Sequence, residues 1–326
     1  MNVLSFDKQC RVIAAITEGC SLRATSRLVD VDKGTVIALQ LKVGEACARL
    51  HDALMRNLNV GILELDEAWS FIGKKQKRVK FNDPRELGDA YVWIGMDAIH
   101  KAIVSYVVGK RTADNAQLLA ADLRARILNR PQITTDGLTA YVDAIDRAFG
   151  IDVDYAMLQK QYAAVAGNDA AHRYSPGAII GVEKQVITGS PDPERISTSF
   201  VERQNLTLRM GIRRMTRLTN AYSKKLRNHI GAIGLHVGYY NYVRVHETLR
   251  ITPAMSLGVT DHVWAIGELI HQALATLEPT PVEPSTPPTL PRDPATGLLV
   301  GRKPFTLRII PGGKIGSKRP ARRSNH

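Results

Sequence analysis

The sequence predicts an α/β protein in which one mixed β-sheet with flanking helices follows an all-helical segment. Residues 7–57 carry apolar side chains at helical spacing, such as Val12, Ile13 and Ile16. From residue 60 the pattern changes to an alternation rich in Ile, Leu and Trp, which is typical of strands. The predicted elements then follow in the order β-β-β-α-β-α-β-α, which indicates a single mixed sheet.

The N-terminal segment has the start and stop signals of three helices. Gly19 ends the first helix, and Ser21 is placed to cap a short second one. After a turn at Asp30 and Val31, Asp32 caps a longer third helix. Two helices joined by such a short turn match the helix-turn-helix pattern, in which the second helix enters the major groove of DNA.

This pattern predicts that residues 1–58 form a DNA-binding domain. Lys33 and Thr35 open the predicted recognition helix and Arg23 belongs to the helix before it, so we expect these three side chains to contact DNA. A plain three-helix packing unit explains the same pattern, and the sequence leaves both interpretations open.

The α/β part contains strands and helices whose limits are marked by Gly, Pro and capping residues. Strands are expected over 59–73, 89–100, 101–111, 131–137 and 151–162, and helices over 112–128 and 138–150. Residues 163–196 are dense in Gly, Pro, Asn and Asp and predict an irregular insertion, after which the basic segment 199–246 returns to helix. The α/β domain is therefore expected to span residues 59–265.

The C-terminal segment 266–326 is expected to be a Pro-rich basic tail. Ten of the sixteen prolines lie between Pro279 and Pro320. Such a composition is typical of disordered chains. The cationic end of the tail either holds DNA loosely or is simply solvated.

The charge of the chain indicates a polyanionic partner. The formal net charge is +13, and strongly basic proteins most often bind nucleic acid, although a soluble protein with surplus charge is the plain alternative. Cys10, Cys20 and Cys47 have neither zinc nor C-x-x-C spacing and are expected to be small apolar residues of a reducing compartment. No apolar run approaches the ~20 residues of a membrane-spanning helix and no signal peptide is recognisable, so we expect a cytoplasmic protein without membrane contact.

Three carboxylates stand at positions where chemistry is expected. Asp66 lies in ELDEAW at the expected end of the first strand, Asp136 in TTDG where the fourth strand ends, and Glu202 in STSFVERQNLTLR at the start of the late helix. In a fold of this order the first and fourth strands are neighbours, so the two aspartates can meet while the late helix packs across them. Adjacent carboxylates repel one another, and Mg²⁺, a cation that prefers oxygen ligands, relieves this repulsion. Mg²⁺ also supports phosphodiester chemistry.

Each carboxylate also has a structural interpretation. Ser199 and Glu202 fit a capping box, and Asp136 with Gly137 fits a common turn. Glu64 and Glu67 compete with Asp66, and strand alternation places Glu64 on the same face as Asp66. Only the combination of three acids at these positions favours a metal site.

These three motifs resemble those of bacterial insertion-sequence DDE transposases, in particular the group related to the insertion-sequence-one transposase. The resemblance covers roughly residues 60–265 and continues through RRMTRLTNAYSKK and YYNYVRVHETLRITPAMSLGVTDHVW. It implies an RNase H-like fold in which Asp66, Asp136 and Glu202 bind Mg²⁺, with Mn²⁺ as a possible substitute. It also implies cleavage at the element's ends, which frees 3′ hydroxyls, and transfer of these ends to target DNA.

The resemblance further implies DNA contacts and a setting for the protein. Arg209 follows Glu202 by seven residues on the same helix face, where similar transposases carry a Lys or Arg that contacts the DNA end. With Arg203, Arg213 and Arg214 it is expected to cradle the DNA backbone. Double-stranded DNA and a second copy of the chain are the expected partners, and the bacterial nucleoid is the expected place. The interval between Asp136 and Glu202 is longer than in many DDE enzymes, and the insertion 163–196 accounts for it.

Two other functions compete with this one. A tyrosine recombinase is set aside because Tyr239, Tyr240 and Tyr242 precede the segment from His246 to Arg250, which is also one residue too long for the recombinase motif. The three tyrosines are better explained as core residues of a helix. The alternative from another class is a DNA-binding regulator or inactive transposase relic that acts only through its helix-turn-helix.

Overall fold

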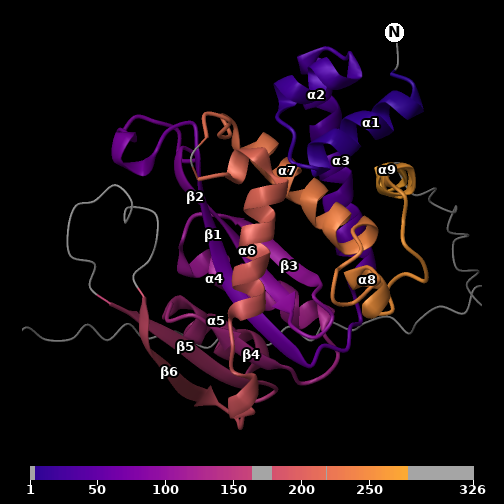
Figure 1. Ribbon diagram of the computed structural model, residues 1–326. Helices are drawn as coiled ribbons and strands as arrows, with labels where there is room; N and C mark the ends of the chain where they lie inside the picture. Colours follow the sequence, from indigo (N-terminus) through magenta and orange to yellow (C-terminus); the bar gives the residue numbers. More distant parts are fainter. Residues whose placement is uncertain (1–3, 164–177, 218, 278–326) are drawn as a thin grey trace, which may run out of the picture. The chain divides into compact units, whose positions relative to one another are not determined.

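Three helices open the computed structural model, which describes residues 4–163, 178–217 and 219–277 (Figure 1). They are α1 Phe6–Thr17, α2 Leu22–Val29 and α3 Lys33–Leu54. The predicted capping residues are confirmed, because Ser21 accepts from the amide of Ala24 and Asp32 from those of Gly34 and Thr35. Gly19 adopts a φ of 81° just after α1, which is the left-handed conformation expected at a helix end.

The sheet has six strands in the order β3-β2-β1-β4-β5-β6. The strands are β1 Ile62–Ile72, β2 Gly88–Asp97, β3 Ile103–Gly109, β4 Gln132–Thr135, β5 Asp154–Tyr162 and β6 Ile179–Thr188. β1 pairs antiparallel with β2 and parallel with β4, and β4 pairs parallel with β5. The mixed sheet is thus confirmed, its first and fourth strands are neighbours, and the order of its first five strands is RNase H-like.

The sixth strand corrects the prediction of an irregular insertion over 163–196. Ile179–Thr188 pair antiparallel with β5, while residues 164–177 lie outside the described part. The density of Gly, Pro and Asn around this segment masked a short run of β-branched residues, namely Ile179, Ile180, Val182, Val186 and Ile187.

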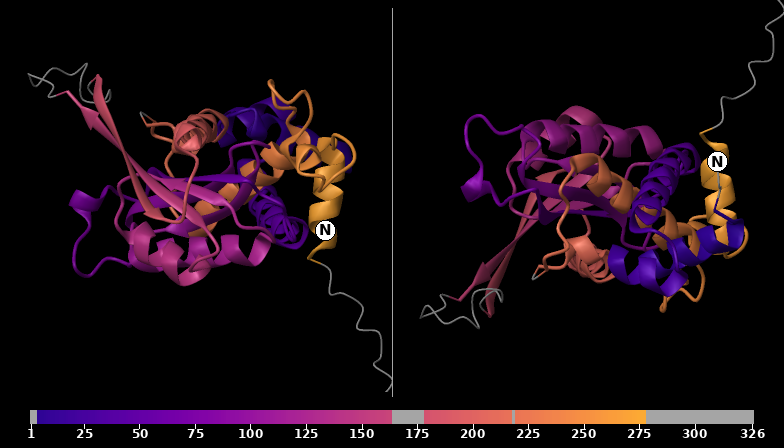
Figure 2. Two further views of the ribbon diagram at one scale, coloured as in Figure 1. Left: turned by 90° about the horizontal axis from the view of Figure 1, so that it is seen from below. Right: turned by 90° about the horizontal axis from the view of Figure 1, so that it is seen from above.

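Helices cover both faces of the sheet (Figures 1 and 2). One face carries α4 Ala113–Arg126 and α5 Ala140–Phe149, and the other carries α6 Ser199–Gly211 and α7 Leu226–Gly238. Side chains alternate along β1, so Leu63 and Leu65 join the core under α4 and α5. Ala68 instead joins Val201 and Leu208 of α6 in the core of the other face. The site described below lies on the strand shared by these two cores.

The N-terminal helices share a third apolar cluster with the C-terminal part of the described chain. Val12, Ile13 and Val43 pack there with Leu235 of α7 and Leu269 of α9, Ile266–Ala275. Helix α3 approaches α7 so closely that a Cβ placed on Gly44 would overlap the backbone of Gly231. The assignment of residues 1–58 to a separate DNA-binding domain stays a prediction.

The last described segments are short helices, and they shorten the predicted tail. The basic segment 199–246 is helical in α6, α7 and a π-helical turn at Tyr239–Val243, but not continuously, because residues 216–217 and 219–225 form no helix. Pro253–Ser256 form α8, and Ile266–Ala275 form α9, which buries Leu269, Ile270 and Ala273. The tail was therefore placed too early at residue 266, and residues 278–326 lie outside the described part.

Two further features bear on the alternatives raised by the sequence. Tyr240 and Tyr242 are buried, as expected of core residues. Among residues 4–163, 178–217 and 219–277, no helix is long and apolar enough to cross a membrane.

Candidate active site

The site is built where β1 continues beyond its neighbour β4. Leu65 and Thr135 are the last paired residues of these two parallel strands, so Asp136 follows the end of β4 as predicted. Asp66 and Glu67 stand just past this point but in the middle of β1 rather than at its predicted end, because β1 continues to Ile72 in its pairing with β2. Neighbouring residues of a strand point to opposite faces. Because β4 ends before it reaches them, the carboxylates of Asp66 and Glu67 can nevertheless both approach Asp136 at the unpaired edge of β1.

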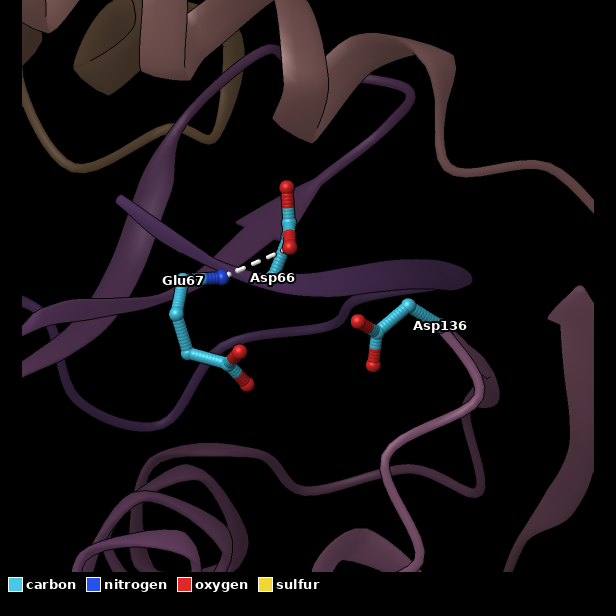
Figure 3. Close-up of side chains that lie close together, drawn as sticks. All are labelled: Asp66, Glu67 and Asp136. Carbon is cyan, nitrogen blue, oxygen red and sulfur yellow. Dashed lines mark hydrogen bonds between the residues drawn. The ribbon is translucent and has the colours of Figure 1, made fainter. Parts of the chain in front are cut away.

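Figure 3 shows the resulting cluster, in which the carboxyl groups of Glu67 and Asp136 point toward one another and Asp66 stands beside them. One oxygen from each of Asp66, Glu67 and Asp136 lies within 4.8 Å of the others. We call these three residues the acidic cluster. Two of the three predicted acids, Asp66 and Asp136, are thus brought together, and Glu67 takes the third place.

The acidic cluster contains more negative charge than its surroundings neutralise. The pKa of Asp66 is raised to about 7, mainly by burial and then by the nearby charges of Asp136, Glu67 and Glu202, against the lowering effect of the hydrogen bond from the Glu67 amide. Burial likewise raises the pKa of Glu67, whose side chain is 3% exposed. Arg111 Nε donates to Glu67 Oε2 at 3.1 Å, and its Nη2 lies 3.5 Å from Asp136 Oδ2. One arginine facing three carboxylates leaves room for a further cation.

Helix α6 is attached to β1 at two points beside this cluster. Glu64 Oε2 accepts from the amides of Phe200 at 2.7 Å and Val201 at 2.9 Å. A carboxylate from the sheet therefore caps α6, whose own N-cap residue Thr198 makes no side-chain capping bond. One turn into the helix, Asn205 Nδ2 donates to Asp66 Oδ2 at 2.8 Å. Glu64 thus stays out of the acidic cluster and instead positions the helix over it.

Glu202 does not join the acidic cluster in this structure. Its Oε1 accepts from Thr198 Oγ1 at 2.7 Å and forms an ion pair with Lys160 of β5. The capping box of Ser199 and Glu202 is wrong, because the helix begins one residue earlier and Glu64 takes the free amides. Glu202 still lies close enough for its charge to raise the pKa of Asp66, after the larger effect of burial.

The turn interpretation of Asp136 is correct in part. Asp136 Oδ1 accepts from the amide of Leu138 at 3.0 Å, as in an Asx turn. Its other oxygen faces Arg111, so the residue serves the turn and the cluster together.

The predicted DNA-binding residues of the late helix differ in their surroundings. Arg209 is half-buried, and burial together with Arg217 lowers its pKa. The charge of Asp66 acts in the opposite direction, which indicates that Arg209 lies near this carboxylate. Arg203 and Arg213 are exposed. Arg214 donates to Gln40 Oε1 of α3 and to the Asn228 carbonyl of α7, both at 2.8 Å.

Arg214 therefore joins helices within the protein, and we leave it out of the DNA surface proposed below. At the N-terminus, Arg23, Lys33 and Thr35 are exposed, and their DNA contacts stay predictions.

Sequence reasoning named Glu67 only as a competitor of Asp66 and missed three other residues around the site. Glu67 and Asn205 carried a signal, because Glu67 adjoins Asp66 and Asn205 follows Glu202 by three residues on one helix face. Arg111 and Lys160 carried none, since only the packing of distant segments brings them to the acids.

Comparisons with known proteins add little to this geometry. No protein-family model matches the chain, and no curated protein matches it significantly. Among solved structures, it is similar to the Mos1 strand transfer complex with 14% identity and a TM-score of 0.21 over 48% of this chain and 59% of that chain. A Mos1 transposase paired-end complex with left transposon end gives 15% identity and a TM-score of 0.20 over 48% and 60%. The piggyBac transposase synaptic complex with hairpin DNA gives 12% identity and a TM-score of 0.34 over 83% and 70%.

The chain spans about three fifths of the length of the Mos1 chains it matches. TM-scores this low carry no argument, and the fold assignment above rests on the strand order alone.

Proposed function

We propose that this chain is a DDE transposase that cleaves DNA strands at the ends of an insertion sequence and transfers them to target DNA. The supporting observation is the meeting of Asp66 and Asp136 at the open edge of β1, in a sheet of RNase H-like order. The sequence resemblance to bacterial insertion-sequence transposases supports the same reaction.

The residues of the site fit a divalent cation of the Mg²⁺ type. Its donors are carboxylate oxygens, which Mg²⁺ and Mn²⁺ prefer. Within the described part of the chain, Glu67 Oε1 and Asn205 Oδ1 are buried without a hydrogen-bond partner, so the site has unused ligand capacity. We assign the metal to Asp66 and Asp136, with Glu67 beside them and Glu202 as the third predicted ligand. When bound, such a cation activates the attacking oxygen and stabilises the leaving oxygen of a phosphodiester.

The chain's own side chains orient these ligands. Asn205 holds one oxygen of Asp66, and Arg111 draws Glu67 and Asp136 together from the other side. Glu64 holds the first turn of α6 against β1 and thereby positions Glu202, which belongs to the same turn. For Glu202 to join the aspartates, it has to exchange its bond with Lys160 for the metal.

DNA is the proposed partner because of the charge of the chain and the cations near the site. Arg203 is exposed on α6, Arg213 is exposed just after it, and Arg209 lies near Asp66. The backbone of a duplex that enters the site therefore meets positive charge. The exposed residues at the start of α3 contact DNA through the proposed helix-turn-helix. Joining two element ends requires at least two copies of the chain.

The decisive experiment compares Asp136→Asn with Asp143→Asn, a matched change of an exposed acid on α5. Duplexes made from the DNA that flanks the coding sequence serve as substrate. Asp136→Asn is expected to abolish Mg²⁺-dependent strand cleavage and to leave DNA binding nearly intact, whereas Asp143→Asn keeps both. Cleavage by Asp136→Asn at the wild-type rate would refute the proposal. A wild-type protein that binds these duplexes but never cuts them would favour the regulator instead.

A further inference from the structure

The segment that links β1 to β2 is a strongly basic exposed loop. Residues 73–88, GKKQKRVKFNDPRELG, contain six Lys or Arg and two acids, a net charge of +4. Five of these cations are exposed, namely Lys75, Lys77, Arg78, Lys80 and Arg85. Figures 1 and 2 show this loop, drawn in purple, extending beyond the end of β2. We call residues 73–88 the basic loop.

The basic loop is held by specific bonds. Asp83 Oδ2 accepts from the amide of Lys80 at 2.6 Å and forms an ion pair with Lys74 at 2.7 Å. The amide of Asp83 in turn donates to the Lys80 carbonyl at 3.0 Å, which closes a β-turn over Phe81 and Asn82. At the base of the loop, Lys110 Nζ donates to the carbonyls of Leu87 and Asp89, both at 2.7 Å.

This turn presents Phe81 completely to solvent, with a relative exposure of 103%. A single exposed apolar residue is ordinary in itself. Here, however, the ring stands at the tip of a locked turn where small polar residues or Pro are preferred, and exposed cations surround it in sequence. An apolar tip between cations suits duplex DNA, because Lys and Arg bind phosphates while an apolar side chain wedges between base steps.

The position of the loop agrees with the same partner. Gly73 follows Asp66 by seven residues. At ~3.3 Å per strand residue this places the base of the loop about 23 Å from the acidic cluster along β1. A duplex rises 3.4 Å per base pair, so the loop reaches DNA about seven base pairs from a strand held at the cluster.

We propose that the basic loop is a second DNA contact, in which Phe81 inserts between base steps of a duplex and the exposed cations bind the flanking phosphates. This inference rests on the proposed function for its partner, since it takes the same DNA. A basic loop with an aromatic tip can also insert into an anionic membrane, and the test separates the two.

Binding of a fluorescent 30-base-pair duplex is measured by anisotropy, in EDTA and at several salt concentrations. Phe81→Ala is expected to bind about tenfold more weakly with an unchanged salt dependence, and Phe81→Trp restores binding. The double variant Lys77→Ala/Arg78→Ala is expected to reduce the slope of log K against log salt by about two. The matched controls Ile151→Ala, an apolar side chain with 84% exposure, and Arg124→Ala/Arg147→Ala keep wild-type affinity and slope.

Each outcome supports or overturns the proposal. Phe81 makes no packing contact that could unfold the chain, and an unchanged melting temperature checks this. If the loop variants bind DNA as tightly as the wild type and the protein still cleaves DNA, the proposed DNA contact of the basic loop is refuted, whereas the proposed function is not. A wild type that binds no duplex overturns both. If phosphatidylserine vesicles bind the wild type but not Phe81→Ala, while DNA binding is the same in both proteins, the loop is a membrane-binding element instead.

Discussion

Two ionic groups of this protein, each with partly buried members, have similar components and opposite balance. In the acidic cluster of Asp66, Glu67 and Asp136, Arg111 pairs with Glu67 and Asp136. Across the α3–α4 contact, Arg126 is 5% exposed and donates to Asp122 Oδ2 at 2.6 Å, to Asp52 Oδ1 at 2.8 Å and to the Met55 carbonyl at 3.0 Å. Arg56 also pairs with Asp52, so this second group, the Arg126 network, holds two acids and two arginines.

The pKa values of the two groups move in opposite directions. Burial acts on both Asp66 and Asp122 and by itself favours a higher pKa in each. At Asp122 the hydrogen bonds from Arg126 and Ser105 outweigh burial, and the pKa falls below its ordinary value. At Asp66 the neighbouring charges are negative, and the pKa rises to about 7. Counter-charge, rather than burial, therefore distinguishes a group that joins helices from one that is prepared for a cation.

The largest effect is expected when Asp66 is changed. Asp66→Asn is expected to reduce cleavage by about a thousandfold or more, since it removes a ligand of the proposed metal. Because the substitution also relieves charge repulsion, the free energy of unfolding without metal stays within about 1 kcal/mol of the wild type.

Urea unfolding and strand cleavage measure these two quantities. Mg²⁺ is expected to raise the melting temperature of the wild type and not of the variant. A metal-dependent rise in both proteins would show that the cation binds elsewhere.

A change of Arg126 tests the Arg126 network, in which the acids and arginines balance. Arg126→Met leaves Asp122 partly buried without its counter-charge, and the expected loss is about 3 kcal/mol of unfolding free energy. Arg124→Met, a more exposed neighbour on α4 whose side chain is 40% exposed, serves as the control and is expected to change stability little. A loss equal to that of the control would mean that the Arg126 network does not stabilise the α3–α4 contact.

Acidification tests a third kind of buried group, the histidines that stay neutral. His229 lies between Ser70 and Ser223, and burial, followed by Arg214, lowers its pKa to about 4. The unfolded chain binds this proton near pH 6.5, so it holds more protons than the folded chain between about pH 6.5 and 4. Stability therefore falls as the pH drops through this window, with about 2 kcal/mol lost at pH 5 through this residue.

His229→Gln is expected to flatten the pH dependence of the melting temperature, whereas the exposed His271→Gln leaves it unchanged. An equal slope in all three proteins would show that His229 ionises in the folded state as it does in the unfolded one.

The smallest effect is expected at Glu64, an acid beside the cluster that accepts from two amides of α6 and whose pKa is raised by burial. Glu64→Gln keeps an acceptor for the α6 amides but loses the charge, and the expected loss of stability is about 1 kcal/mol. Cleavage is expected to fall up to tenfold because the start of α6 carries Glu202. The exposed Glu86→Gln is the matched control for both urea unfolding and cleavage. A rate unchanged by Glu64→Gln would remove this residue from the positioning of Glu202.

The sequence was sufficient to predict most of the elements and one contact of the site. Helical spacing, strand alternation and capping residues are local signals, and they placed Ser21, Asp32 and the order of the first five strands correctly. Since the first and fourth strands are parallel neighbours, the proximity of Asp66 and Asp136 followed and is confirmed. Strand β6 was missed because its β-branched residues lie among turn formers, and helix α9 because the tail was drawn too long.

By itself, then, the sequence determined the fold class, the pair of aspartates and the excess of positive charge, all of which depend on local pattern or composition. Only the tertiary structure decided which other groups meet those aspartates. Glu67 can turn toward Asp136 because β4 ends at Thr135, opposite Leu65, and Glu202 bonds to Lys160 forty-two residues away. Glu64, 136 residues before Phe200, holds the helix that carries Glu202. Such partners are chosen by the packing of distant segments, and no local periodicity encodes them.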